Sequence, residues 1–179
     1  RAYALLNDTL GLHESEYWAF LEYEEMAAKI AFMQEGDVST LSGLGKALAQ
    51  SVCNEGMGLF SAFVMLLNYQ RFGKMKGMCT IVEWSVRDET LHVLHMAQLF
   101  RTFCEEHPRI VNDEFKSEIY RMYTRAIDLE DKVIDLAYQI GEPQGLTASE
   151  MKQYIRYIAD RRLIQIGLRG IYKVKDNPL

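Results

Sequence analysis

The sequence of 179 residues lacks the features of several protein classes. No apolar run reaches the roughly 20 residues that a membrane-spanning helix needs. No Lys/Arg cluster or Gly-rich phosphate loop is present and the net charge is −5, so we expect no nucleic-acid surface. Three scattered cysteines, Cys53, Cys79 and Cys104, are too few for a disulfide framework or a zinc knuckle. The protein is therefore expected to be cytoplasmic, with buried thiols and no membrane contact.

Proline is also scarce, with three residues, and the alternating pattern of β-strands is absent. Apolar residues instead recur every three or four positions, most clearly over residues 115–140, which is typical of an amphipathic helix. Gly-Glu-Pro at 141–143 ends this helix, because proline cannot continue the helical hydrogen bonds. Thr147 and Glu150 have the spacing of a capping box, and a last helix is predicted from there to about Tyr172.

Four more helices are predicted in the N-terminal part of the chain. They cover the first ten residues, the segment "SEYWAFLEYEEMAAKIAFM" up to Gly36, one very long helix over 39–72 that is broken at Gly73 and Gly77, and roughly 78–104. No linker or repeat divides the chain, and its length suffices to bury one core. We predict an all-α fold, a single-domain bundle of long helices over residues 1–179. The domain is expected to be truncated at both ends, because the helical pattern begins at residue 1 and no polar tail follows Leu179.

Two polar side chains interrupt the apolar stripe of the predicted helix over 78–104. The stripe itself comprises Ile81, Val82, Val86, Leu94, Leu99 and Phe103. Glu89 and His92 are three residues apart and so project from one side of the helix, where a carboxylate and an imidazole can reach the same ion. Glu-x-x-His alone is weak evidence, and a solvated pair or a hydrogen-bonded core histidine is the simpler alternative.

Glu55 is the only acidic residue of the segment 41–69. An unpaired carboxylate in a core is costly, so Glu55 is expected to be protonated, paired or bound to metal. Gly56 and Gly58 beside it favour a distorted or closely packed backbone at that point. A structural alternative is equally open: the glycines permit a tight helix crossing, and Glu55 pairs with an arginine such as Arg87.

The segment "VRDETLH", residues 86–92, resembles the second Glu-x-x-His element of the class I ribonucleotide reductase small subunit, a radical-generating member of the ferritin-like superfamily. In that family one glutamate on the preceding long helix lies 34 residues before the glutamate of this element, and Glu55 and Glu89 have the same separation. The resemblance covers essentially the whole chain. It implies that Glu55, Glu89 and His92 ligate the second metal of a carboxylate-bridged dinuclear site.

The same resemblance implies roles for residues beside this motif. Asp88 matches the acid that orients a histidine ligand and belongs to the radical-transfer route. His95 has no ligand counterpart and is expected to be packed or hydrogen-bonded. The family's other three ligands, an aspartate and a first glutamate–histidine pair, would lie upstream of Arg1, and its C-terminal tail beyond Leu179. Acidic residues in "HESEYWAFLEYEE" fit the solvent face of a helix better than a substitute for those ligands.

The opening residues "RAYALLND" resemble the segment that directly follows the family's first glutamate–histidine pair. On that register Tyr3 takes the position of the tyrosine that is oxidised to a stable radical. Leu59 and Phe63 would line the apolar pocket around the radical. Ser85 occupies a place in that pocket where an aliphatic residue is more usual.

The resemblance implies an oxidoreductase. Two iron ions, or a manganese–iron or di-manganese pair, would activate oxygen and oxidise Tyr3. The oxidising equivalent would pass to the ribonucleotide reductase large subunit, which reduces ribonucleotides to deoxyribonucleotides, and the small subunit would be a homodimer. The 179-residue chain alone is expected to lack radical-generating activity. Two other classes stay open: another ferritin-like dimetal oxidase or hydroxylase, which Tyr3 and Asp88 argue against, and a non-catalytic helical fragment with an incomplete metal site.

Overall fold

The computed structural model of the protein describes residues 2–179, with the side chains of Ala19 and Phe20 excepted. Arg1, the predicted start of the first helix, lies outside the described residues. Over the described range the chain forms helices and loops without a β-strand, which confirms the all-α class. The α-helices are α1 (Ala2–Leu10), α2 (Ala19–Glu22), α3 (Glu24–Met33), α4 (Leu41–Gly56), α5 (Phe60–Leu67), α6 (Lys76–Glu106), α7 (Asp113–Ile140) and α8 (Ala148–Gln165). Short 3-10 helices lie at Glu14–Tyr17, Asn68–Phe72 and Pro108–Ile110.

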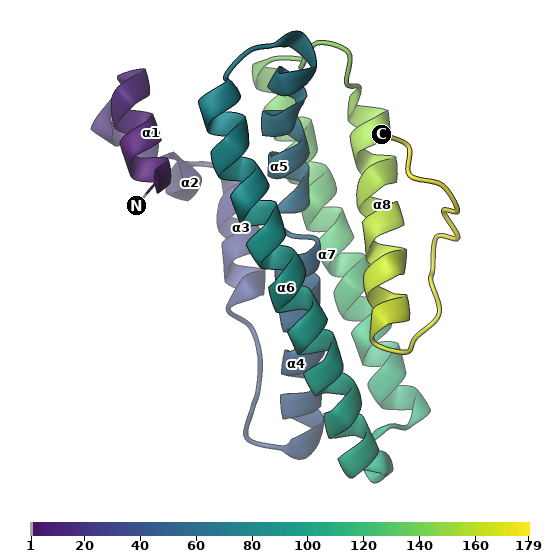
Figure 1. The fold of residues 1–179 in the computed structure, drawn as a ribbon. Helices are drawn as coiled ribbons and strands as arrows, with labels where there is room; N and C mark the ends of the chain where they lie inside the picture. Colours follow the sequence, from purple (N-terminus) through teal and green to yellow (C-terminus); the bar gives the residue numbers. More distant parts are fainter. Residues whose placement is uncertain (1) are drawn as a thin grey trace.

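The helices from α3 to α8 run side by side as a bundle (Figure 1). α4 packs chiefly against α6, and α7 contacts α3, α4 and α8. α5 follows α4 along the same side of α6, and α3 and α8 flank this pair from opposite sides (Figure 1). α1 and α2 lie at one edge of the bundle, and the residues after α8 return along the outside of that helix (Figure 1).

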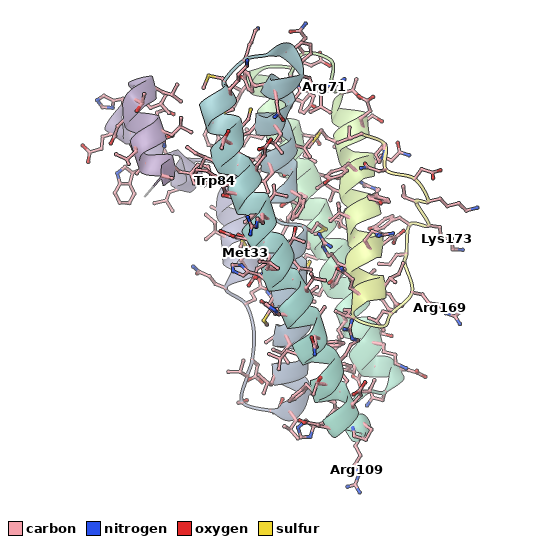
Figure 2. All side chains as sticks on the ribbon, viewed as in Figure 1. Met33, Arg71, Trp84, Arg109, Arg169 and Lys173 are labelled. Atoms are coloured by element: carbon pink, nitrogen blue, oxygen red, sulfur yellow. The ribbon has the colours of Figure 1, made fainter. Side chains whose placement is uncertain are left out.

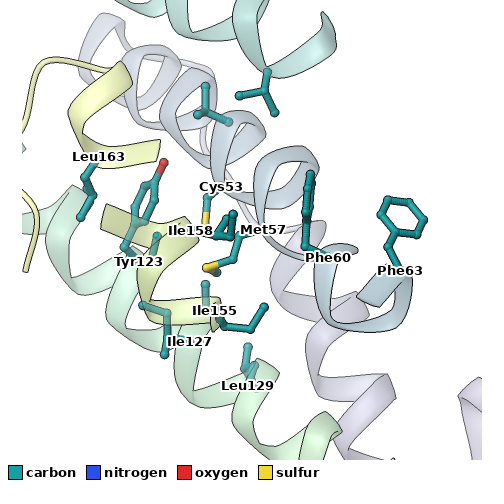
Figure 3. Close-up of a cluster of buried hydrophobic side chains, with 14 of the residues drawn as sticks. Cys53, Met57, Phe60, Phe63, Tyr123, Ile127, Leu129, Ile155, Ile158 and Leu163 are labelled. Atoms are coloured by element: carbon teal, nitrogen blue, oxygen red, sulfur yellow. The ribbon is translucent and has the colours of Figure 1, made fainter. Parts of the chain in front are cut away.

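The core lies where α4 and α5 face α7 and α8 (Figure 3). Its fully buried side chains include Met57, Ile119, Tyr123, Ile127, Ile134, Met151, Ile155 and Leu163. Each buried aliphatic or aromatic side chain contributes about 1.5–3 kcal/mol, so this layer supplies most of the stabilisation. The predicted burial of the thiols is confirmed for Cys53 and Cys79, whereas Cys104 is half-buried.

The boundaries of α7 and the start of α8 agree with the sequence. The side chain of Asn112 caps α7 by accepting a bond from the N–H of Phe115 at 2.9 Å, and the helix ends just before Gly141, as predicted. The capping box of α8 is confirmed: Thr147 Oγ1 accepts from the N–H of Glu150 at 3.2 Å, and Glu150 Oε2 accepts from the N–H of Thr147 at 2.8 Å. Local hydrogen bonds of this kind are specified within a few residues.

The prediction of one unbroken helix over 39–72 is wrong. α4 ends at Gly56, and α5 begins only at Phe60. Gly73 ends the following 3-10 helix with a φ of 67°, as predicted, because glycine adopts this left-handed conformation without steric cost. The predicted break at Gly77 is wrong as well, since α6 begins at Lys76 and runs through that glycine.

Two other predicted helices are shorter than expected. α8 ends at Gln165 and not near Tyr172, because Gly167 adopts a φ of 83° and the chain then turns back toward the buried carboxylate of Asp160. The long N-terminal helix is divided into a 3-10 helix, α2 and α3. Tyr23, with φ −94° and ψ 120°, separates α2 from α3, because an extended residue interrupts the helical hydrogen bonds.

The apolar stripe predicted for α6 is only partly correct. Val82 is buried, but Leu94 and Leu99 are each 49% exposed. Trp84 of the same helix is 60% exposed and lies on the side of α6 nearest α1 and α2 (Figure 2). Of the helices that the structure describes, none combines the length and the apolarity that crossing a membrane requires.

Candidate metal centre

Glu55, Glu89 and His92 come together where the end of α4 meets the middle of α6. Each offers one ligand atom, and these atoms lie within 4.8 Å of one another. His92 Nδ1 lies 3.4 Å from Glu55 Oε2 and 3.2 Å from Glu89 Oε2. The three side chains that the sequence groups as ligands of one ion therefore form a single cluster around one imidazole nitrogen.

The local helices explain this geometry. Glu89 and His92 are one turn apart on α6, so both project toward the same side. Glu55 lies in the last turn of α4, and the hydroxyl of Ser51, one turn earlier, donates to Glu55 Oε1 at 3.0 Å. Ser51 is not among the residues predicted from the sequence, although its spacing of four residues from Glu55 places the two side chains on one face of α4.

The cluster lies at the surface of the bundle. The side chains of Glu55, Glu89 and His92 are 35%, 19% and 57% exposed. Glu55 is therefore half-buried and not a core carboxylate. It is paired, as expected, but its partners are His92 and Ser51. Arg87, the alternative partner, is exposed.

Two other residues of the motif region lie on the outer side of α6. Asp88 is exposed, and its role in orienting a ligand or transferring a radical stays a prediction. His95 is exposed too, and among the described residues its side chain takes part in no hydrogen bond of the structure. The expectation of a packed or hydrogen-bonded His95 is therefore wrong, because its position on α6 faces away from α4.

Tyr3 connects α1 to α6 close to this region. Its hydroxyl lies 2.7 Å from Ser85 Oγ. The hydroxyl of Ser85 also lies 3.3 Å from the carbonyl of Ile81, one turn earlier on α6, to which it can donate. Phe63 is buried and Leu59 is half-buried against the core. That these two residues line a radical pocket at Tyr3 stays a prediction.

The residues of the cluster fit a metal ion. Two carboxylates and one imidazole suit hard or borderline divalent ions such as Fe²⁺ and Mn²⁺. A bound ion would replace the proton that Nδ1 of His92 must carry in order to bond either carboxylate. Three protein ligands leave coordination positions open for water or for further ligands.

The fold and the cluster together define a class of protein. Long helices that project acidic and histidine side chains toward one another are the arrangement in which helical bundles build metal sites between facing helices. The sequence comparisons assign the chain within this class. Residues 1–178 match the family ribonucleotide reductase, small chain. The chain therefore belongs to the ribonucleotide reductase small chain family.

Individual relatives are consistent with this family. The chain is 36% identical over 99% of its length to a ribonucleoside-diphosphate reductase small subunit of Invertebrate iridescent virus 3. It is 33% identical over 92% of its length to a ribonucleoside-diphosphate reductase subunit beta of Chlamydia pneumoniae. The chain spans about half the length of these relatives, 52% and 51%.

Solved structures show the same fold. A class I ribonucleotide reductase from Bacillus halodurans superposes with a TM-score of 0.82 at 28% identity, covering 92% of this chain and 60% of that chain. The ribonucleotide reductase R2 subunit from Clostridium botulinum superposes with a TM-score of 0.88 at 22% identity, covering 98% and 58%. The second match bears on the fold alone. The bundle is therefore ferritin-like, as the resemblance implies.

Proposed function

We propose that the chain is part of a radical-generating small subunit, and that Glu55, Glu89 and His92 bind one ion of a dinuclear iron or manganese centre. The observation that carries this proposal is the convergence of the three ligand atoms within 4.8 Å. Family membership supports it. The partnership with a large subunit, a homodimeric state and a cytoplasmic location are parts of the same proposal.

Each residue has a distinct task. Glu89 and His92 are held at a fixed separation by one turn of α6, and Glu55 closes the site from α4 while the hydroxyl of Ser51 orients its carboxylate. The bound metal would supply the oxidising chemistry with dioxygen. The remaining ligands of the centre and the ribonucleotide-reducing site would be provided outside this set of residues.

Tyr3 is the residue that we expect to be oxidised. It would lose an electron to the metal centre and release its hydroxyl proton, while the hydrogen bond of 2.7 Å to Ser85 Oγ holds the phenol oxygen in place. Tyr3 is 38% exposed, so solvent can take this proton directly. Asp88 would then belong to the route by which the oxidising equivalent reaches the large subunit.

Metal content tests the ligand assignment. Iron and manganese per chain are measured by mass spectrometry after anaerobic loading, for the wild type and for Glu55→Gln, Glu89→Gln and His92→Ala. We expect about one ion per wild-type chain, since three ligands can hold a single ion, and loss of the metal in each variant. Glu83→Gln is the matched control, because Glu83 is an exposed carboxylate of α6 that bonds only Gln70 among the described side chains. Equal metal in the wild type and the three ligand variants, or a wild type without metal, contradicts the proposal.

A further inference from the structure

The break between α4 and α5 begins after Gly56, one residue beyond the candidate ligand Glu55. In a continuous helix the N–H of Phe60 would bond the carbonyl of Gly56, four residues earlier. It bonds the carbonyl of Met57 instead, at 3.0 Å. Met57, with φ −139° and ψ −43°, departs from helical geometry. Carbonyl groups at the end of α4 therefore need partners from elsewhere.

Two cationic side chains from different helices supply these partners. Arg162 of α8 donates from Nε to the carbonyl of Gly56 at 2.9 Å. Lys29 of α3 donates from Nζ to the carbonyl of Gly58. α3 and α8 lie on opposite sides of the broken helix (Figure 1). The break is thus held from both sides, and cations at the end of a helix also interact favourably with its dipole.

Both cations are held firmly in place. The guanidinium of Arg162 lies 5.4 Å from the ring centroid of Phe60, and its Nη1 donates to Gln165 Oε1 at 3.0 Å. Lys29 forms an ion pair with Glu130, which is 1% exposed and also accepts a bond from the hydroxyl of Ser61 at 2.6 Å. Side chains with several fixed partners lose little freedom when they bond a carbonyl, so they can define its position.

Gly56 connects this arrangement to the candidate metal centre. A Cβ atom on Gly56 would lie 2.5 Å from Arg162 Nε and 3.0 Å from Cγ2 of Val93. Val93 follows the candidate ligand His92 on α6. Gly56 is therefore packed tightly between Arg162 and Val93. A shift of the backbone at the break would move Glu55 relative to His92.

We propose that Arg162 and Lys29 are positioning residues for the candidate metal centre: by holding the carbonyls of Gly56 and Gly58, they set where Glu55 stands relative to His92. The predicted effect of these two residues on metal affinity rests on the proposed function. The positions of the backbone and of the imidazole can be measured without metal.

The test compares Arg162→Met with Arg156→Met, a matched loss of an arginine from the same helix. Arg156 makes a bidentate pair with Asp131 at 2.7 and 3.0 Å and donates to the carbonyl of Lys152, but to no carbonyl of the break. Amide hydrogen exchange of residues 53–63 and the ¹⁵N chemical shift of His92 Nδ1 are recorded in metal-free protein. For Arg162→Met we expect exchange about 10- to 100-fold faster in this segment, the effect of losing one charge-assisted hydrogen bond. We also expect a changed His92 shift. Arg156→Met should alter neither.

Two further variants keep the test decisive if Arg162→Met folds poorly. Arg162→Lys retains a donor and should restore much of the protection. The double variant Lys29→Met with Glu130→Gln removes the other cation without leaving a buried charge unpaired, and should reproduce the local loss. Exchange that rises equally in Arg156→Met, or a His92 shift that stays unchanged in all these variants, overturns the positioning role.

Metal binding separates this inference from the proposed function. Where wild-type protein binds Mn²⁺, the affinity should fall roughly 10- to 100-fold in Arg162→Met, as it does when groups that orient metal ligands are removed. Unchanged affinity would overturn the inference and leave the proposed function intact. A wild type that binds no Mn²⁺ contradicts the proposed function, whereas the exchange and the His92 shift still decide the positioning role.

Discussion

Asp160 holds the segment that follows α8, and its replacement should release that segment. The carboxylate is 4% exposed. Its Oδ1 accepts from the N–H groups of Ile171 at 2.6 Å and Tyr172 at 3.0 Å, and its Oδ2 accepts from the N–H of Val174 at 3.2 Å. Only glycine fits at position 170 without a movement of Asp160, because a Cβ atom there would lie 2.8 Å from Asp160 Cγ.

The size of the effect follows from these contacts. A hydrogen bond to a charged group contributes about 1.5–3 kcal/mol, so three such bonds set an upper limit of roughly 4.5–9 kcal/mol for Asp160→Ala. The loss is smaller than this limit, because the freed N–H groups regain water once the segment detaches. We expect the free energy of unfolding to fall by about 2–4 kcal/mol. Asp160→Asn keeps one acceptor oxygen and should lose less.

Urea denaturation measures the global loss, and hydrogen exchange measures protection of the three amides. The control is Asp135→Ala on α7, because Asp135 pairs with Lys152 at 2.6 Å but is 52% exposed. An exposed pair contributes only about 0–1 kcal/mol. An Asp160→Ala variant that loses no more stability than Asp135→Ala, or that keeps the protection of the amides of residues 171, 172 and 174, would show that Asp160 does not hold the segment.

Three other predictions follow from single contacts. In thermal melts, Gly56→Ala should lower the free energy of unfolding by about 1–3 kcal/mol, because the new methyl would lie 2.5 Å from Arg162 Nε. Gly77→Ala serves as the control: its methyl enters open space within α6 and should raise the free energy of unfolding by about 0.4–1 kcal/mol. Ser61→Ala removes a bond of 2.6 Å to a buried carboxylate, and urea titration should show a loss of about 1.5–3 kcal/mol. Hydrogen bonds from the backbone and the hydroxyl of Thr147 lower the pKa of Glu150. The ionised carboxylate therefore stabilises the fold at pH values above the ordinary carboxyl pKa, and this contribution is lost as the pH falls through the lowered pKa. Glu150→Gln should remove this part of the acid-side pH dependence of Tm.

The helix boundaries that the sequence predicts correctly depend on contacts between near neighbours. Asn112 and Thr147 begin α7 and α8 by bonding amides three residues away, and Gly141 follows the last residue of α7. The relation of Glu89 to His92 is of the same kind, because one turn of helix places both on one side. The pairing of this motif with Glu55 came from the family resemblance and from the separation of 34 residues.

The tertiary structure alone decides the break after Gly56 and the end of α8. The sequence marks Gly56 as unusual, but the carbonyls at the break are bonded by Lys29 and Arg162, whose positions in the chain are 29 and 106 residues from their acceptors. α8 likewise stops where Asp160 can bond a returning segment. Helical periodicity reports which backbone groups can bond their neighbours, and it contains no information about remote donors. The local elements were therefore determined by the sequence itself, whereas the position of Glu55 within its cluster depends on side chains that only the folded bundle brings to it.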